Sequence, residues 1–399
     1  MQIKKFISET AAALLSAALI GLFGTSVYYS ERLPETITVS GFAETEIAQY
    51  PEITLCSGSA GQASEQADLS LFGIIPVKKV EVRQAKPPEL IVGGQPFGIK
   101  LLMDGVMVTA LGKVEADSEN TVCPAAEAGV KVGDIIRTAA DIPLTSNAQL
   151  QDTISSSGGE PLELSVERDG IIFNTTLKPV YSEISRQWKG GMWVRDSIAG
   201  IGTMTFIDKA TGRFAGLGHP ICDSDTGGIV PVHSGEAVPV EITDTKRGER
   251  GIPGELRGRF TSGSFGSLDL NNGCGVFGEL NEEALKSALS EGEVFPLGYR
   301  QEITTGNAEI FTTVNGHTPQ RYAIEIESID YSGKDNSKNM KIRITDEKLL
   351  ESSGGIVQGM SGSPIIQNGR LIGAVTHVFV AEPDCGFAVF ADNMAEFLG

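Results

Sequence analysis

The sequence has few basic residues, few cysteines and few histidines, and each shortage excludes a class of protein. Its 399 residues carry 32 Lys and Arg against 51 Asp and Glu, a formal net charge of −19. This balance excludes a general nucleic-acid binder, because phosphate backbones require a basic surface. The five cysteines, at positions 56, 123, 222, 274 and 385, include no Cys-x-x-Cys pair. The sequence therefore indicates neither a zinc ribbon nor a dense disulfide scaffold.

Aromatic residues make up only 7% of the chain and prolines number 18, whereas glycines number 48. This composition predicts tight turns and short strands rather than a bundle of helices, so we expect a mainly β protein. The apolar fraction of 41% is sufficient for packed cores, and the length suits two or three domains. No P-loop, dinucleotide-binding fingerprint or His-Glu-x-x-His motif occurs. We expect neither a cofactor nor a metal ion.

The first 29 residues indicate export. Lys4 and Lys5 precede an uncharged run over 11–29, which as a helix would span about 28 Å, close to the ~30 Å of a hydrocarbon layer. Positive charge before such a run stays on the cytoplasmic side, so the rest of the chain should lie outside the cytosol. Residues 1–29 are thus a membrane anchor or a cleaved signal peptide, with Gly24 and Ser26 small enough for a poor cleavage site.

The rest of the chain divides into three regions. Residues 30–88 form a juxtamembrane region with two expected strands, Thr36–Ser40 and Leu71–Val82. Residues 89–180 form a compact unit of strands and short helices. Residues 181–399 consist of short apolar stretches separated by glycine turns, which is typical of sandwich or barrel packing. This last region is long enough for two six- or seven-stranded barrels.

The unit at 89–180 resembles a PDZ domain. The resemblance is carried by P-A-A-E-A-G-V-K-V-G-D-I-I-R at Pro124–Arg137 and by G-G-Q-P-F-G-I at Gly93–Ile99. PDZ domains bind an extended peptide as an added strand and hold its terminal carboxylate on backbone N–H groups. By position, the helix near Leu150 would flank the groove, and the carboxylate loop would consist of Gln95, Pro96, Phe97 and Gly98. The expected partner is a peptide C-terminus or an internal peptide, unless the unit only packs on its neighbour.

A nucleophile motif lies near the C-terminus, in Gly359-Met360-Ser361-Gly362-Ser363-Pro364. A serine between glycines in a tight loop exposes its hydroxyl. The N–H groups of Gly359 and Ser361 can point at one spot, where they would hold the oxyanion of an acyl-transfer intermediate. The loop and the hairpin after it resemble the nucleophile loop of chymotrypsin-like serine proteases, G-D-S-G-G-P. Met360 replaces the aspartate, so the zymogen switch of those enzymes is absent.

The same alignment predicts the substrate-binding cleft. Gly355 would form an uncharged base of the pocket, Val378 would narrow its mouth, and His377 would line the cleft wall. We therefore expect a small or β-branched apolar residue before the scissile bond.

A serine is a poor nucleophile without a base, and the chain has only four histidines. His219, in G-L-G-H-P-I-C-D, precedes the serine as in chymotrypsin-like enzymes and is the candidate base. His377 is the alternative base. His233 and His317 lack a supporting glycine context and are expected at the surface.

The acid that would orient the histidine is left open by the residues alone. Asp346, in I-R-I-T-D-E-K-L-L, precedes the serine by a short stretch. Asp208, Asp223 and Asp225 are nearer to the candidate base in sequence. Asp346 would equally suit the cap of a short helix.

Several of these segments occur together in one family. The segment Gly355–Val380, the G-L-G-H-P-I motif, the strand L-F-G-I-I-P-V-K-K-V, the PDZ-like unit and the N-terminal run are similar to the stage IV sporulation protein B family of signalling serine peptidases. The resemblance implies a triad of His219, Asp346 and Ser361. It also implies export from the forespore to the space between two membranes, cleavage of a membrane regulatory protein that leads to sigma-factor maturation, and self-cleavage.

A different class of function is also compatible with the chain. A non-catalytic scaffold could bind peptide termini through the PDZ-like unit and keep an inert barrel. Such a scaffold would not need to retain G-H-P, I-T-D and G-M-S-G-S-P together. We therefore favour a membrane-associated serine endopeptidase with a chymotrypsin-like double β-barrel.

Overall fold

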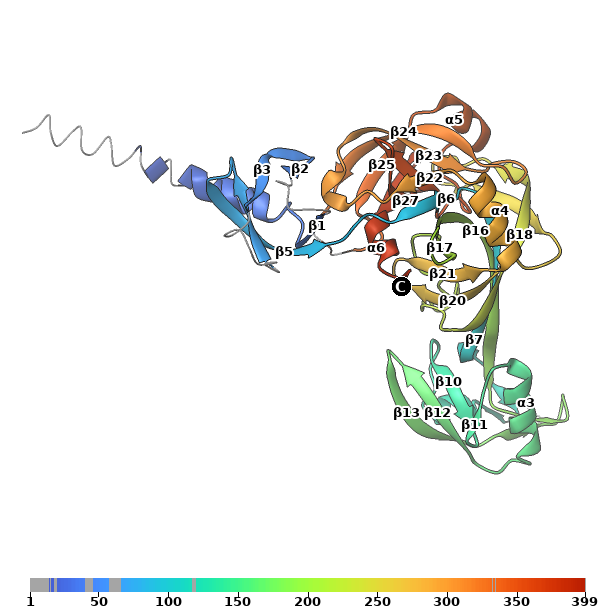
Figure 1. Ribbon diagram of the computed structural model, residues 1–399. Helices are drawn as coiled ribbons and strands as arrows, with labels where there is room; N and C mark the ends of the chain where they lie inside the picture. Colours follow the sequence, from blue (N-terminus) through green and yellow to red (C-terminus); the bar gives the residue numbers. More distant parts are fainter. Residues whose placement is uncertain are drawn as a thin grey trace, which may run out of the picture.

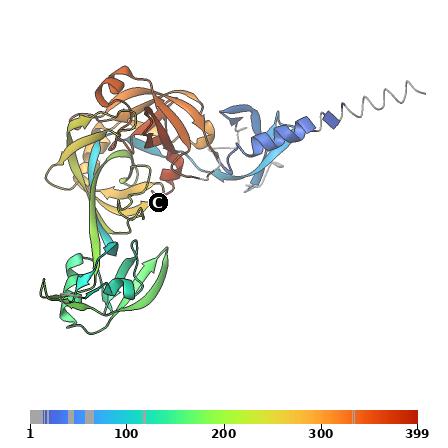
Figure 2. The same cartoon turned by 180° about the vertical axis from the view of Figure 1, so that it is seen from behind.

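The computed structural model describes residues 20–39, 46–56, 66–116, 120–331 and 335–398, together with residues 14, 16, 17 and 333. The chain is mainly β and forms three bodies (Figures 1 and 2). A small N-terminal sheet lies at one end, two β-barrels pack against each other, and a smaller unit hangs from the barrels on two long strands. The active-site candidates lie on the barrels.

The N-terminal sheet follows a helix over residues 20–30. Leu33, Ile37, Ile53 and Leu69 form its core and have no exposed surface. The strand expected at Leu71–Val82 is split by a turn, because Phe72 and Gly73 adopt positive φ angles and reverse the chain. In sheet order the strands are β1 (Thr36–Val39), β5 (Ile75–Gln84), β4 (Gln66–Leu71), β3 (Tyr50–Cys56) and β2 (Glu46–Ile47).

Among the residues with a described structure, no helix is long and apolar enough to cross a membrane. Residues 11–13, 15, 18 and 19 of the uncharged run at 11–29 lie outside the described residues.

The first barrel is a ring of six strands closed by the pairing of β7 with β16. Along the first half of β7, Phe97, Ile99, Leu101 and Met103 are buried at every second position, as expected for a strand with one face in a core. In ring order the strands are β7 (Pro96–Leu111), β18 (Val232–Lys246), β20 (Gly266–Asn272), β21 (Gly275–Leu280), β17 (Arg213–Gly216) and β16 (Met192–Asp208).

Shorter elements extend this barrel. Asn281 caps α4 through a hydrogen bond from the N–H of Ala284 to its side chain. These elements are β6 (Glu89–Val92), β19 (Glu255–Phe260), α4 (Glu282–Glu291) and β22 (Val294–Pro296).

The second barrel is closed and also has six strands. Its interior contains Ile310, Ile324, Ile342 and Val375, all without exposed surface or nearly so. In ring order the strands are β23 (Gly306–Thr312), β24 (Gln320–Ile329), β25 (Met340–Ile344), β28 (Glu382–Phe390), β27 (Arg370–Phe379) and β26 (Pro364–Gln367). Two barrels were expected from the sequence, but the first takes β7 from a region that the sequence suggested belonged wholly to the PDZ-like unit.

The PDZ-like unit is inserted between β7 and β16. Its core contains Val108, Ile136, Leu150 and Leu164. A hairpin turn lies at Asp169-Gly170, with positive φ at both residues. Its elements are β8 (Val114–Glu115), β9 (Thr121–Val122), α2 (Pro124–Glu127), β10 (Ile135–Ala139), β11 (Ile142–Pro143), α3 (Asn147–Ser156), β12 (Leu162–Arg168), β13 (Ile171–Leu177), β14 (Val180–Ser182) and β15 (Gln187–Lys189).

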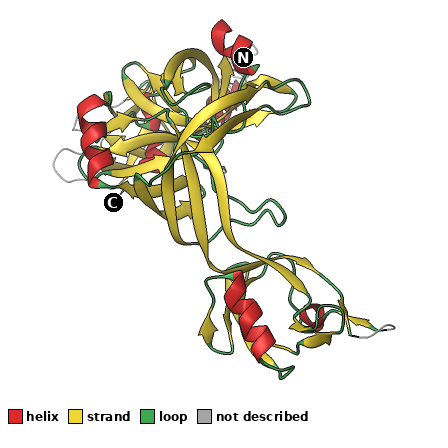
Figure 3. Ribbon diagram, turned by 90° about the vertical axis from the view of Figure 1, so that its right-hand side faces the viewer, coloured by secondary structure: helices red, strands yellow, loops and turns green. Residues whose placement is uncertain are grey.

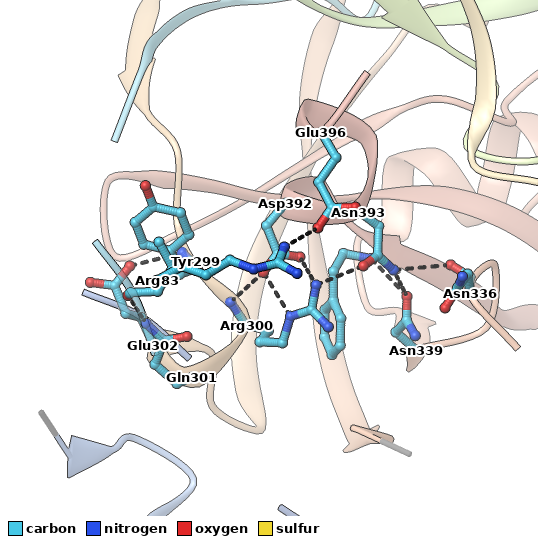
Figure 4. A network of polar contacts seen from close by, with 12 residues as sticks. Arg83, Tyr299, Arg300, Gln301, Glu302, Asn336, Asn339, Asp392, Asn393 and Glu396 are labelled. Atoms are coloured by element: carbon cyan, nitrogen blue, oxygen red, sulfur yellow. Dashed lines mark hydrogen bonds and ion pairs between the residues drawn. The ribbon is translucent and has the colours of Figure 1, made fainter. Parts of the chain in front are cut away.

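A polar network fixes the C-terminal helix α6 (Ala391–Ala395) against the second barrel (Figure 4). Arg300, at the start of the short helix η1 (Arg300–Glu302), donates from Nε to Asp392 at 2.8 Å and from Nη2 to Asn393 at 2.7 Å. Asn393 donates in turn to the Oδ1 of Asn339 at 3.0 Å. Arg83 of β5 reaches Glu396 at 3.2 Å, so the N-terminal sheet is tied to the same helix.

Candidate active site

Ser361 and His219 line one pocket of about 280 Å³. His219 follows β17 of the first barrel, and Ser361 precedes β26 of the second. The pocket is also lined by Gly359 and Gln358 from the serine loop and by Leu217 beside the histidine. The structure therefore brings together the nucleophile and the base that the sequence suggested.

The serine loop is held from the first barrel by Thr203 of β16. The Thr203 N–H donates to the carbonyl of Ser361 at 3.0 Å, and its Oγ1 donates to the carbonyl of Gly359 at 2.8 Å. Gly359 and Gly362 have φ angles of +98° and +96°, in the region that favours glycine. Cross-barrel hydrogen bonds and two glycines thus define the loop conformation.

The N–H groups of Gly359 and Ser361 donate no hydrogen bond to any described residue, whereas the neighbouring amides of Met360 and Gly362 donate to Val357 and Val375. The two unbonded amides remain available to a developing oxyanion, which is the role that the sequence suggested for them.

The imidazole of His219 is held by the backbone of the next residue. Its Nδ1 lies 2.8 Å from the carbonyl oxygen of Pro220, so Nδ1 carries the proton and Nε2 keeps a lone pair. Burial lowers the pKa of His219 below its usual value, although the hydrogen bond to Pro220 opposes this shift. A neutral imidazole with a free Nε2 is the form that a general base requires.

In this structure the Ser361 hydroxyl donates to the carbonyl of Thr376 at 2.8 Å and not to His219. The hydroxyl and the imidazole share the pocket, and a hydrogen bond between them requires the serine to give up its contact with Thr376.

His377 of β27 lies beside the candidate base, with its ring tilted by 40° from that of His219. The ring centroids of His219 and His377 are 5.2 Å apart. The Nδ1 of His377 is buried without a hydrogen-bond partner in the described chain. Burial, followed by the proximity of His219 and Lys338, lowers the pKa of His377 to about 4. His377 is therefore neutral at the pH where the base would work.

Family models match most of this architecture. The model of the SpoIVB peptidase S55 family matches residues 186–395, and a PDZ domain model matches residues 118–168. The chain belongs to the SpoIVB peptidase S55 family. Membership of the S55 family supports a serine peptidase, and the inserted unit of this S55 peptidase is a PDZ domain.

No curated protein matches the sequence of this S55 peptidase. Among solved structures, the PDZ domain of the SdrC-like protein from Listeria monocytogenes is 21% identical over 23% of this chain and 87% of that chain, with a TM-score of 0.19.

In this structure Asp346 of the S55 peptidase has no hydrogen bond to His219. Its carboxylate accepts hydrogen bonds from the N–H groups of Lys348 and Leu349, at 3.0 and 3.2 Å, and caps α5 (Glu347–Ser353). Asp346 also does not line the pocket. The helix-capping role anticipated for this residue is present, and its part in a triad stays a prediction.

The other acids have partners of their own. Asp208 accepts from Thr211 at 2.7 Å. Asp223 is buried and forms an ion pair with Arg195, and Asp225 lies 2.7 Å from the same guanidinium. His233 and His317 are exposed, as expected.

The substrate-binding residues expected from the alignment do not line the pocket of the S55 peptidase, although His377 lies beside His219. Gly355 is buried, and a side chain there would collide with the carbonyl of Pro383. Neither Gly355 nor His377 nor Val378 lines the pocket. Much of the lining is instead apolar and includes Ile99, Ile198, Ile201 and Ile221.

The prediction of a carboxylate loop at Gln95, Pro96, Phe97 and Gly98 is wrong. Pro96, Phe97 and Gly98 belong to β7 and pair with β16 on one side, and Phe97 and Gly98 pair with β18 on the other. Phe97 is fully buried in the first barrel. Both edges of this segment are therefore occupied by strands, and no peptide can add to it.

Sequence reasoning missed the contribution of β16. Residues 198–201 line the active-site pocket and Thr203 fixes the serine loop, but this stretch carries no motif. Cys222, three residues after His219, is exposed and also lines the pocket. Cys123, Cys222, Cys274 and Cys385 are free thiols.

Proposed function

We propose that this S55 peptidase is a serine endopeptidase in which Ser361 is the nucleophile and His219 is the general base. The observation that supports this most directly is that the two side chains, from different barrels, line one pocket together with Gly359. A scaffold with an inert barrel has no need for this convergence.

In the proposed reaction the Nε2 of His219 takes the proton of the Ser361 hydroxyl as the oxygen attacks the scissile carbonyl. The N–H groups of Gly359 and Ser361 stabilise the negative charge on the carbonyl oxygen. The histidine then gives its proton to the leaving amine, and the C–N bond breaks to leave an acyl-enzyme. Water, deprotonated by the same nitrogen, attacks the ester and regenerates the serine.

Asp346 is proposed as the acid that orients His219, on the strength of its motif, and two substitutions separate this role from helix capping. Asn retains the capping oxygen but not the charge, whereas Ala removes both. If Asp346 acts in a triad, Asp346→Asn should lower turnover by about 10⁴-fold with little loss of stability. If it only caps α5, Asp346→Asn should retain activity and Asp346→Ala should cost about 1 kcal/mol of stability.

The proposed setting is extracytoplasmic signalling in sporulation. The uncharged run at 11–29 and the SpoIVB family match support an exported, membrane-associated peptidase of the forespore intermembrane space. Its proposed substrates are a membrane regulatory protein and the enzyme itself, and its PDZ domain is proposed to bind peptide. The isoleucine-rich lining of the pocket favours an apolar side chain next to the scissile bond.

Self-processing of the purified full chain tests the catalytic proposal. Ser361→Ala and His219→Ala should each abolish the appearance of shortened chains. His233→Ala, which changes an exposed histidine, should leave processing unchanged. Mass spectrometry of the intact chain measures the products. Continued processing by pure Ser361→Ala protein would favour the non-catalytic scaffold. So would a wild-type chain that cleaves neither itself nor the peptides of an added library.

A further inference from the structure

The strand β16 lines two pockets. Residues 192–194, at its start, line a pocket of about 380 Å³ beside α3 of the PDZ domain. Residues 198–201, further along, line the pocket that holds Ser361 and His219. Figure 3 shows long strands running from the barrels to the unit that holds α3. The PDZ groove and the candidate active site are thus joined by one strand.

One edge of β16 lacks a strand partner between these pockets. The opposite edge pairs with β7 from Met192 to Thr203, and β17 joins only from Met204 onward. Within the described chain, no strand pairs with the remaining edge of residues 192–201, and at Thr203 that edge is already bonded to Ser361 and Leu217. Such an edge presents a row of N–H and C=O groups with which an extended peptide can pair.

The residues around the start of β16 have the chemistry to bind the C-terminus of a peptide. Lys189, Gly190 and Gly191 line the groove just before the strand, and a lysine beside glycine backbone offers a site for a carboxylate. Trp193 lines the same groove and is 70% exposed, so its ring is available to an apolar side chain. The Oδ1 of Asn147, also in this groove, is buried without a hydrogen-bond partner in the described residues.

An ion pair fixes the strand midway between the two pockets. Arg195 forms an ion pair with the buried carboxylate of Asp223 and lies 2.7 Å from Asp225. Both acids belong to the loop that contains His219. The distance along β16 from the PDZ groove to the base is therefore held by a side-chain contact as well as by the backbone.

We infer that one extended polypeptide binds along the unpaired edge of β16, with its free C-terminus in the PDZ groove and its scissile bond beside Ser361. Antiparallel pairing places the peptide C-terminus at Met192 and its upstream residues toward Ile201. The span is about nine residues, or ~30 Å at ~3.3 Å per residue. The PDZ domain then selects C-terminal segments and sets how far from the end they are cut. This inference rests on the proposed peptidase function only for the cleavage step.

Binding can be tested without catalysis. A random library of peptides of about fourteen residues with free C-termini, long enough to cover the span, is selected on the full-length Ser361→Ala chain in detergent micelles. Alkylation of Cys222 by iodoacetamide, followed by mass spectrometry, reports on the active-site pocket, because this thiol is exposed there. A selected peptide should slow Cys222 alkylation at least threefold. Its last six residues alone should bind without slowing it.

Matched variants locate the C-terminal end of the site. Trp193→Glu should weaken binding of the selected peptide at least tenfold and remove the protection of Cys222. Ile171→Glu alters a side chain on β13 of the same domain that is also 70% exposed and should change neither. Amidation of the peptide C-terminus should weaken binding. Protection of the buried Cys385 from alkylation verifies folding, and Trp193→Gln replaces the glutamate variant if that protection is lost.

Several results would overturn the inference. They are the failure of the library to yield a binder, full-length peptides that leave Cys222 alkylation unchanged, and binding unaffected by the substitution at Trp193. With the active chain, cleavage should fall about nine residues before the C-terminus and should keep that spacing when residues are added upstream. Peptide binding and protection of Cys222 without any cleavage would refute the peptidase proposal. The inference that a peptide binds along the edge of β16 would still stand.

Discussion

Acid should destabilise the second barrel through His377. Burial, with His219 and Lys338 nearby, lowers the pKa of this histidine to about 4, against a smaller opposing effect of Asp335. In the unfolded chain the same side chain has a pKa of about 6.5. Between these values the unfolded chain takes up a proton that the folded chain does not, so the free energy of unfolding falls as pH falls.

The magnitude follows from the two pKa values. A difference of about 2.5 units corresponds to about 3 kcal/mol. This stabilisation is fully present above about pH 6.5 and is lost by about pH 4. The unpartnered Nδ1 of His377 gives the physical reason, because a buried imidazolium would have a proton there with no acceptor.

Urea unfolding followed by circular dichroism measures the effect on chains that carry Ser361→Ala. Between pH 7.5 and 4, the chain with His377 should lose about 3 kcal/mol more stability than the chain with His377→Gln. His233→Gln, at an exposed histidine, should follow the unsubstituted chain. The reasoning would be refuted by equal losses with and without His377, or by an NMR titration that places the pKa of His377 near 6.5.

Three further predictions concern the site and its support. Thr203→Val removes the hydrogen bond to Gly359 and should lower kcat about tenfold with KM nearly unchanged; unaltered kinetics on a peptide substrate would contradict this. Ser363→Ala removes buried hydrogen bonds and should cost about 1–2 kcal/mol of stability in urea unfolding while activity persists; loss of activity in a stable protein would count against this structural role. Because burial lowers the pKa of His219, the acid limb of the kcat/KM profile should lie below about pH 6.5, and a limb at higher pH would show that another group controls the activity.

The sequence predicted the parts of the site that depend on local chain conformation. Ser361 and His219 stand next to glycines whose positive φ angles shape their loops, and such signals are visible in neighbouring residues. The acid was not settled in this way. Asp346 has the sequence context of a helix cap, and the structure shows that contact.

The arrangement of β7 could not be predicted from local pattern. The sequence suggested that the whole of residues 89–180 forms one compact unit. In the structure Gly105 has φ +94°, but the chain continues as one strand because it pairs with β16 and β18. These partners lie far along the sequence, so the pairing leaves no trace in nearby residues. The carboxylate loop was misplaced for the same reason.

The insertion of the PDZ domain between two barrel strands limits how the protein can be dissected. A fragment cut to the span of the S55 match, 186–395, would keep β16 and lose β7. The first barrel would then lack one strand, and its apolar interior would be open to water. Removing the PDZ domain while preserving the enzyme therefore requires splicing: a short turn would have to join β7 near Leu102 to β16 near Ser197, which already face each other in register.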